Sequence, residues 1–220
     1  MGKPGPMTSN ILNGARFTLA ANEITQLPYD TGAEVAFAGR SNAGKSSALN
    51  ALTGHNSLAR TSKTPGRTQL MVVFELPPLK RENEEPLQAR LVDLPGYGYA
   101  KVPDAMRAHW RREIDAYLKM RRSLRGIVLI VDIRHELKDF DRMMLEFCAD
   151  TELPCHVLMT KADKVSRGEG SRALEALRKY FRENKVPGTV QMFSSLAKTG
   201  VDEARARVIE LLHTPRAHEL

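Results

Sequence analysis

Residues 39–46 read Gly39-Arg40-Ser41-Asn42-Ala43-Gly44-Lys45-Ser46, which fits the pattern G-x-x-x-x-G-K-[ST]. An apolar run (35–38) precedes this stretch and a helix-forming segment (47–52) follows it, as a phosphate-binding loop requires. The two glycines let the backbone wrap around a pyrophosphate, and the loop N–H groups add positive potential at the start of the helix. Lys45 is predicted to reach the β- and γ-phosphates, and Ser46 to give its hydroxyl to Mg²⁺.

The pattern around this loop predicts one doubly wound α/β domain. Apolar and β-branched runs predict six strands, at 35–38, 70–76, 89–92, 126–131, 155–159 and 190–193. Helical apolar stripes fill the intervals at 47–52, 106–118, 140–147, 174–181 and 201–212. A polar segment bounded by prolines (77–86) predicts a loop joining an antiparallel hairpin. We therefore expect a mostly parallel six-stranded sheet with one antiparallel strand and helices on both faces.

The composition fits this fold and excludes several other classes. The chain has 220 residues, of which 42% are hydrophobic, and two cysteines. Wholesale disorder and a disulfide framework are therefore excluded, and Cys148 and Cys155 are predicted to be reduced. No apolar run is long enough to span a bilayer, and no secretory signal begins the sequence. We expect a cytoplasmic protein with a flexible leader (1–15), a single domain (16–214) and a tail (215–220).

A second phosphate-site motif follows the predicted strand 89–92. Asp93-Leu94-Pro95-Gly96 fits D-x-x-G. Asp93 is predicted to hold a Mg²⁺-bound water, and the Gly96 amide to meet the γ-phosphate. Alone this motif is weak, because Asp before a Pro-Gly turn is common, but its position after the hairpin strengthens it.

Two further stretches predict that the base is guanine. Thr160-Lys161-Ala162-Asp163 follows the strand 155–159 and fits [NT]-K-x-D. Asp163 can accept hydrogen bonds from guanine N1–H and the 2-amino group, which adenine does not offer. The aliphatic stem of Lys161 can cover the base. Phe193-Ser194-Ser195 ends the last strand, where a backbone amide should meet guanine O6.

The remaining Mg²⁺ ligand must come from the segment before Leu70. Thr64 and Thr68 are both candidates. Thr64 precedes a proline, which biases it toward an extended turn, whereas Thr68 lies two residues before the strand and is favoured. The predicted nucleotide contacts here are Gly66, Arg67, Thr68, Gln69 and Leu70. This Gly-, Ser- and Thr-rich segment should be ordered by a γ-phosphate and mobile without one.

The chain resembles the EngB (YihA/YsxC) family of bacterial GTPases. The resemblance covers about residues 17–212 and rests on 39–46, Thr64-Pro65-Gly66-Arg67-Thr68-Gln69, Asp93-Leu94-Pro95-Gly96-Tyr97-Gly98-Tyr99, 160–163 and Phe193-Ser194-Ser195-Leu196. It implies a Ras-like fold, Mg²⁺-dependent binding of GTP or GDP, and a role in assembling the large ribosomal subunit with a link to cell division and septation. It also supports Thr68 over Thr64. The predicted catalytic set is Lys45, Thr68 and Gly96.

Two positions bear on the rate of hydrolysis. Ras-type enzymes orient the attacking water with a Gln after D-x-x-G, and this chain has Tyr97 there. A phenol on a mobile loop is a poor substitute, so slow unassisted hydrolysis is expected. Asn42 stands where related GTPases coordinate K⁺, which could neutralise charge that develops between the phosphates. The alternative is that Asn42 only satisfies backbone groups of the loop.

The net charge of +7, from 33 basic and 26 acidic residues, suggests a polyanionic partner. Residues 101–125 carry eight basic and three acidic side chains, a net of +5, and residues 164–185 carry seven and three, a net of +4. Arg60, Lys63 and Arg67 add three cations. These cations either contact rRNA phosphates of a large-subunit precursor or form solvated helix faces. No interleaved aromatics support sequence-specific reading of bases.

Three hypotheses for the function remain at this point. In the first, a monomeric GTPase binds a ribosomal precursor in one nucleotide state and leaves in the other. In the second, a GTP-sensing RNA- or protein-binding module hydrolyses GTP only incidentally. In the third, a P-loop kinase phosphorylates a small metabolite, and Asp163 has no role. The six histidines show no metal-ligand spacing.

Overall fold

The computed structural model describes residues 10–59, 70–82, 84–97 and 104–215. Within these residues the strands are β1 (Arg16–Ala21), β2 (Ala33–Gly39), β3 (Met71–Arg81), β4 (Glu84–Asp93), β5 (Leu124–Asp132), β6 (Cys155–Thr160) and β7 (Gly188–Met192). The α-helices are α1 (Lys45–Thr53), α2 (Asp104–Met120), α3 (Asp139–Asp150), α4 (Arg167–Glu183) and α5 (Val201–His213). Three short 3-10 helices cover Ile11–Gly14, Ile24–Gln26 and Ala162–Lys164.

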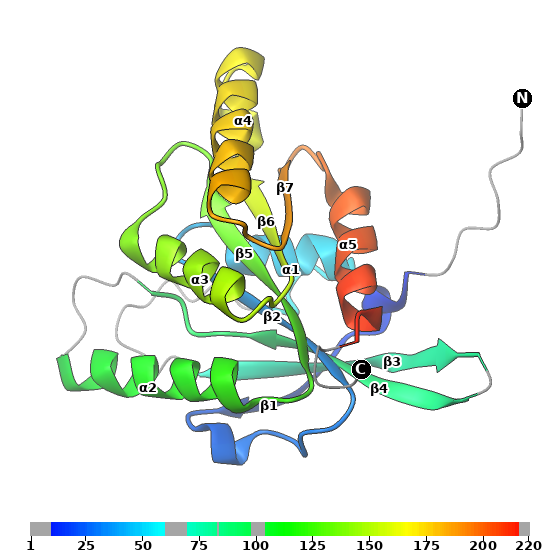
Figure 1. Ribbon diagram of the computed structural model, residues 1–220. Helices are drawn as coiled ribbons and strands as arrows, with labels where there is room; N and C mark the ends of the chain where they lie inside the picture. The colour runs from blue at the N-terminus through cyan, green and yellow to red at the C-terminus, as the bar shows by residue number, and fades with distance from the viewer. Residues whose placement is uncertain (1–9, 60–69, 83, 98–103, 216–220) are drawn as a thin grey trace, which may run out of the picture.

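In the described part of the chain, the strands form one seven-stranded sheet in the order β1-β3-β4-β2-β5-β6-β7 (Figure 1). β3 is antiparallel to both β1 and β4, and the other pairs are parallel. The predicted α/β class and the single reversed strand are confirmed, whereas the prediction of six strands is wrong by one. The sequence pattern misses β1 because it is a largely exposed edge strand, with Phe17 60% exposed, and so has no apolar pattern.

The predicted antiparallel hairpin is confirmed, but the predicted loop at 77–86 is wrong, because residues 77–81 belong to β3 and residues 84–86 to β4. The pairing runs from Val72 opposite Asp93 out to Arg81 opposite Glu84. Its register shifts between Leu76 and Leu79, where the two prolines lie on exposed positions. Proline is tolerated at such an irregularity because no ladder hydrogen bond is required of its nitrogen. The hairpin therefore extends well past the main sheet, toward the right in Figure 1.

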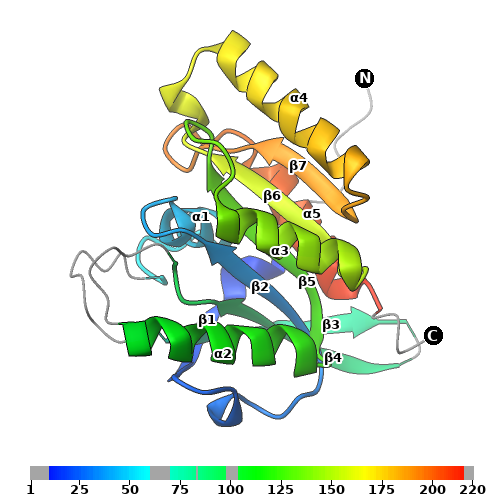
Figure 2. The same cartoon turned by 60° about the vertical axis from the view of Figure 1, so that its left-hand side comes forward.

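Helices cover both faces of the sheet, as predicted. Figure 2 shows α2, α3 and α4 in front of the sheet and α5 behind it. One apolar cluster lies under α2, α3 and α4 and includes Tyr117, Met144 and Phe181. The other lies under α1 and α5 and includes Leu49 and Val208. The predicted α3 stripe of Phe140, Met143, Met144 and Phe147 is wrong at Met143, which is 42% exposed, whereas Leu145 and Cys148 are buried.

A buried carboxylate joins α2 to the base of the sheet. Glu34, on β2, is fully buried and accepts from the Arg121 guanidinium at 2.7 and 3.0 Å. The Tyr117 hydroxyl and the Arg90 guanidinium donate to the same carboxylate at 3.1 and 3.2 Å. Each charge has an opposite partner, which a buried ion requires.

This arrangement corrects the charge predicted for residues 101–125. Arg121 and Arg125 are 5% and 6% exposed, so they do not belong to a basic face. Lys101 and the Arg107 side chain lie outside the described part of the chain, as do Arg60, Lys63 and Arg67. The exposed cations that the structure describes in this segment are Arg111, Arg112, Lys119 and Arg122.

The predicted leader at 1–15 is too long at its inner end. Ile11–Gly14 form a 3-10 helix that Asn10 caps, and Leu12 is fully buried. The folded part therefore begins before residue 15; residues 1–9 lie outside the described part of the chain. Among the described helices, none has the length and apolar character needed to cross a bilayer.

Candidate nucleotide-binding site

The G-x-x-x-x-G-K-S stretch forms the predicted loop between β2 and α1. Gly39 ends β2, and a Cβ there would lie 2.8 Å from the Ile130 carbonyl oxygen, so no larger residue fits. Gly44 caps α1 with φ +97°, a backbone conformation that favours glycine. Lys45 and Ser46 then begin the helix, whose N-terminus attracts anions. The loop thus has the local geometry of a phosphate site.

Lys45 is ion-paired with Asp93 at the end of β4. The Lys45 ammonium donates to Oδ1 of Asp93, and the two side chains are only 12% and 13% exposed. Burial raises the pKa of Asp93, and the Lys45 charge opposes this rise. The structure therefore brings the predicted phosphate-binding lysine and the predicted carboxylate for the metal-bound water together in one half-buried position.

The chain after Asp93 passes directly over the phosphate loop. Leu94 and Pro95 are buried, and the Leu94 amide donates to the Phe37 carbonyl at 2.9 Å. A Cβ on Gly96 would lie 3.6 Å from both the Gly39 carbonyl oxygen and the Ser41 nitrogen. Gly96 therefore lies against the loop that is predicted to hold the phosphates.

The [NT]-K-x-D stretch is bonded to the phosphate loop. Thr160 ends β6, and its hydroxyl donates to the Ala43 carbonyl. The Lys161 ammonium donates to the Asn42 carbonyl at 2.7 Å. It is also 2.8 Å from Oδ2 of Asp132, the last residue of β5. These bonds join two motifs that are more than a hundred residues apart in the sequence.

Asp163 and the stretch after β7 also meet. The Ser194 hydroxyl donates to Oδ1 of Asp163 at 2.6 Å, and the Ala162 amide donates to the Phe193 carbonyl at 3.1 Å. The Ser194 hydrogen bond, with help from Lys164, holds the pKa of Asp163 below its usual range. Phe193 and Ser194 are buried, and Ser195 is half-buried. Asp163 is thus kept ionised as a hydrogen-bond acceptor, which a guanine base needs.

Of the segment predicted to supply the remaining Mg²⁺ ligand, the structure describes Leu70. Leu70 immediately precedes β3 and is half-buried. The other predicted contacts, Gly66, Arg67, Thr68 and Gln69, and the alternative ligand Thr64, lie outside the described part of the chain.

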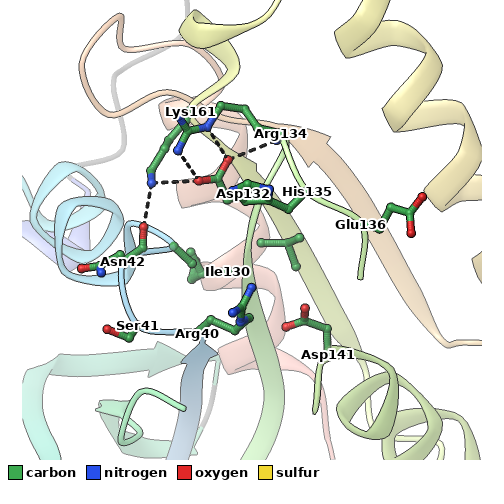
Figure 3. A pocket seen from close by; sticks show the side chains of 12 residues that line it. Arg40, Ser41, Asn42, Ile130, Asp132, Arg134, His135, Glu136, Asp141 and Lys161 are labelled. Atoms are coloured by element: carbon green, nitrogen blue, oxygen red, sulfur yellow. Dashed lines mark hydrogen bonds and ion pairs between the residues drawn. The ribbon is translucent and has the colours of Figure 1, made fainter. Parts of the chain in front are cut away.

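Asp132 is a candidate site residue that belongs to none of the sequence motifs. Burial alone would raise its pKa, but hydrogen bonds from Arg134 and Lys161 outweigh burial and hold the pKa below the usual range. Asp132 helps to line a cavity of about 200 Å³ beside the phosphate loop, together with Arg40, Asn42 and Asp141 (Figure 3). An acidic residue that ends the most apolar strand, as Asp93 ends β4, is the signal that could have identified it.

The sequence predicts Tyr97 on a mobile loop, whereas the structure holds its side chain in contact with α3. Its hydroxyl donates to Oδ1 of Asp141 on α3, and its ring packs on Phe140 with centroids 3.8 Å apart. The Ser41 amide donates to its carbonyl oxygen at 2.8 Å. Burial first, and then the Asp141 charge, raise the pKa of this phenol well above its usual value. Tyr97 is therefore a neutral side chain whose hydroxyl donates its hydrogen bond to Asp141.

Comparisons with known proteins agree with this geometry. A family model described as 50S ribosome-binding GTPase matches residues 34–161. A probable GTP-binding protein EngB from Stenotrophomonas maltophilia (strain K279a) is 54% identical over 198 residues, covering 90% of this chain and 94% of the relative. A protein of the same name from Xanthomonas euvesicatoria pv. vesicatoria (strain 85-10) is 52% identical over 201 residues, with 91% and 93% covered.

Solved structures show the same fold. A crystal structure of a probable GTP-binding protein engB has a TM-score of 0.60 at 23% identity and covers 82% of this chain and 98% of its own. A single-site variant of Aquifex aeolicus Era bound to GDP·AlF4⁻ has a TM-score of 0.59 at 22% identity and covers 85% and 58%. At this identity the likeness concerns the fold alone.

Proposed function

The chain belongs to the EngB family of P-loop GTPases, and on this basis we propose that it hydrolyses GTP as a switch in assembly of the large ribosomal subunit. One observation carries the nucleotide part of the proposal. The Lys161 ammonium donates to the Asn42 carbonyl at 2.7 Å. Asp163, two residues after Lys161, accepts from the Ser194 hydroxyl at 2.6 Å. Phosphate loop and base motif thus form one site, with an ionised carboxylate suited to guanine.

Each motif has a role in this proposal. Amides of the phosphate loop and Lys45 bind the phosphates, Asp163 and the Ser194–Ser195 stretch select guanine, and Gly96 senses the γ-phosphate. The Ser46 hydroxyl and the Asp93 carboxylate are oxygen donors next to the loop, which fits Mg²⁺. Thr68 is the proposed second direct ligand. Mg²⁺, when bound with the nucleotide, would neutralise phosphate charge.

The anchored Tyr97 supports slow intrinsic hydrolysis. Its hydroxyl already donates to Asp141, so it does not orient an attacking water from where it lies. Compensation by K⁺ at Asn42 is part of the proposal. Within the described part of the chain the Asn42 side chain makes no hydrogen bond, which weakens the alternative that it serves only to satisfy loop backbone groups.

The proposed partner is a large ribosomal subunit precursor, bound through rRNA phosphates. The matched family model carries ribosome binding in its description. The seven basic side chains of residues 164–185 are all exposed, so the α4 face supports phosphate contact better than the partly buried α2 segment. The link to cell division and septation, the cytoplasmic location and the monomeric state are proposed on the resemblance stated above.

Two measurements with purified large ribosomal subunits test this proposal. The first is co-sedimentation with GDP or with a GTP analogue that resists hydrolysis. The second is GTP turnover with and without subunits. We expect nucleotide-dependent binding that weakens steeply with salt, and stimulated turnover. Binding without stimulation would favour the module with incidental hydrolysis. Absence of both, in a chain that still binds GTP, would overturn the ribosomal role.

A further inference from the structure

Tyr97 is held at two points, one on its backbone and one on its side chain. The Ser41 amide of the phosphate loop donates to the Tyr97 carbonyl at 2.8 Å, and Arg40 and Tyr97 form a parallel bridge. This bridge extends the pairing direction of β2 and β4 past their ends. The side chain reaches the other way, to α3, where its hydroxyl meets Asp141 and its ring packs on Phe140.

Asp141 is a rigid partner for this hydroxyl. It is 2% exposed and lies in the first turn of α3. Its second carboxylate oxygen accepts from the Lys138 amide at 2.9 Å, as part of the N-terminal cap of the helix. Figure 3 shows the Arg40 guanidinium facing this carboxylate across the cavity. A carboxylate fixed by a helix cap cannot follow Tyr97 if Tyr97 moves, so the contact defines one position of the tyrosine.

Gly96 is the residue that this position controls. It precedes Tyr97 directly and lies against Gly39 and Ser41 of the phosphate loop. With Tyr97 anchored, Gly96 has little freedom to leave the loop. Without the anchor, Gly96 would depend on its backbone contacts to the phosphate loop alone.

We propose that the Tyr97–Asp141 hydrogen bond is a positioning contact that holds Gly96 at the γ-phosphate position and thereby favours GTP over GDP. The inference rests on the proposed function, in which the Gly96 amide meets the γ-phosphate. A ligand that contacts Gly96 binds more tightly when Gly96 is already in place, because binding then does not have to supply the free energy of ordering Gly96. GDP has no γ-phosphate, so its affinity does not depend on where Gly96 lies.

The decisive variant is Tyr97→Phe, which keeps the ring on Phe140 and removes only the hydroxyl. Affinities for Mg²⁺-GDP and for a Mg²⁺-GTP analogue that resists hydrolysis would be measured by calorimetry. We expect the affinity for the GTP analogue to fall about five- to tenfold, and that for GDP to stay within about twofold. Tyr29→Phe is the matched control, because Tyr29 is 91% exposed and should change neither affinity.

A double-mutant cycle separates positioning from general damage. Asp141→Asn removes the charge of the acceptor and leaves an oxygen for the Lys138 amide. We expect it to lower the GTP-analogue affinity as Tyr97→Phe does, and to add little in the Tyr97→Phe background. Independent, additive effects would overturn the contact as the cause.

The remaining outcomes are also informative. Equal losses for GDP and the GTP analogue, or no loss for either, would overturn the positioning role. If the wild-type chain itself binds neither nucleotide, the proposed function fails, and that result is distinct from any difference between variants. Urea unfolding of each variant would show whether the fold is retained.

Discussion

Lys161 and Asp132 form an ion pair of 2.8 Å between the ends of β6 and β5. The lysine stem is thereby fixed across the top of two neighbouring strands while its ammonium also bonds the phosphate loop. The pair thus connects Asp132, which lies outside the recognised motifs, to the base motif and, through Lys161, to the phosphate loop.

Asp132→Asn should weaken GDP binding by about 1 kcal/mol, roughly fivefold, because Lys161 loses its charged partner. Arg134→Gln is the matched control: Arg134 also pairs with Asp132, but its side chain is 43% exposed, and among the described residues its side-chain hydrogen bonds go to Asp132 and not to the loop. We expect calorimetry to show little change for this control. Equal losses in the two variants would contradict a role through Lys161.

Asp163→Asn should weaken GDP binding by at least about 100-fold, because the amide nitrogen cannot accept from the guanine edge and leaves polar groups unpaired. Ser194→Ala, which removes the 2.6 Å hydrogen bond to Asp163, should cost less, about 1 kcal/mol. Asp202→Asn, at a side chain that is 94% exposed, is the control. An Asp163→Asn protein with unchanged guanine preference would favour the kinase hypothesis.

Glu34→Gln should lower the free energy of unfolding by about 3 kcal/mol, because two buried guanidinium groups lose the carboxylate that neutralises them. Urea unfolding monitored by circular dichroism would measure this loss. Glu85→Gln, on the exposed part of the hairpin, should have almost no effect. A Glu34→Gln protein with an unchanged urea midpoint would show that the buried cluster contributes no net stability.

The buried His156 should make stability depend on pH. Its Nε2 lies 2.9 Å from Gln191 Oε1 and its Nδ1 2.8 Å from the Thr189 hydroxyl, and burial holds its pKa below the ordinary 6.5. Above 6.5 both folded and unfolded chains have a neutral ring. As pH falls below 6.5, the unfolded chain binds the proton first, so stability falls until the folded pKa is passed.

Urea midpoints at pH 7.5 and 5.5 would measure this effect. His156→Gln should reduce the difference between the two midpoints, whereas the exposed His213→Gln should leave it unchanged. If both variants keep the wild-type difference, other groups cause the pH dependence.

GTP turnover should be faster in KCl than in NaCl at equal ionic strength, by at least about tenfold, if Asn42 helps to hold K⁺ near the phosphates. Asn42→Ala should remove the difference without preventing GDP binding. Identical wild-type rates in the two salts would refute the hypothesis.

The sequence predicts the strand ends that carry the candidate site better than it predicts the edges of the sheet. Gly39, Asp93, Thr160 and Phe193 each end or follow a buried strand, and the short loops there leave little choice of position. β1 is an exposed edge strand that is defined by pairing with the distant strand β3. The outer part of the β3–β4 hairpin pairs locally, but its exposed polar residues and prolines give no strand pattern.

The sequence also does not predict which side chains pair across the fold. Nothing near Arg121 in the sequence indicates Glu34, since the two residues are brought together only by packing of α2 on the sheet. The sequence predicts Tyr97 on a mobile loop, but its side chain contacts Phe140 and Asp141 of a later helix. Charge counts along a sequence therefore overestimated the basic face at 101–125 and underestimated how fixed the residue after D-x-x-G is.

The long β3–β4 hairpin has a practical consequence for handling this molecule. Its pairing continues from Val72 opposite Asp93 to Arg81 opposite Glu84, so its tip lies roughly 25–30 Å from the nucleotide edge. A cysteine introduced at Glu82 could carry a fluorophore or a surface tether far from every motif. Both native cysteines are buried, so such a label would attach selectively at residue 82. It would report nucleotide binding without blocking the nucleotide site.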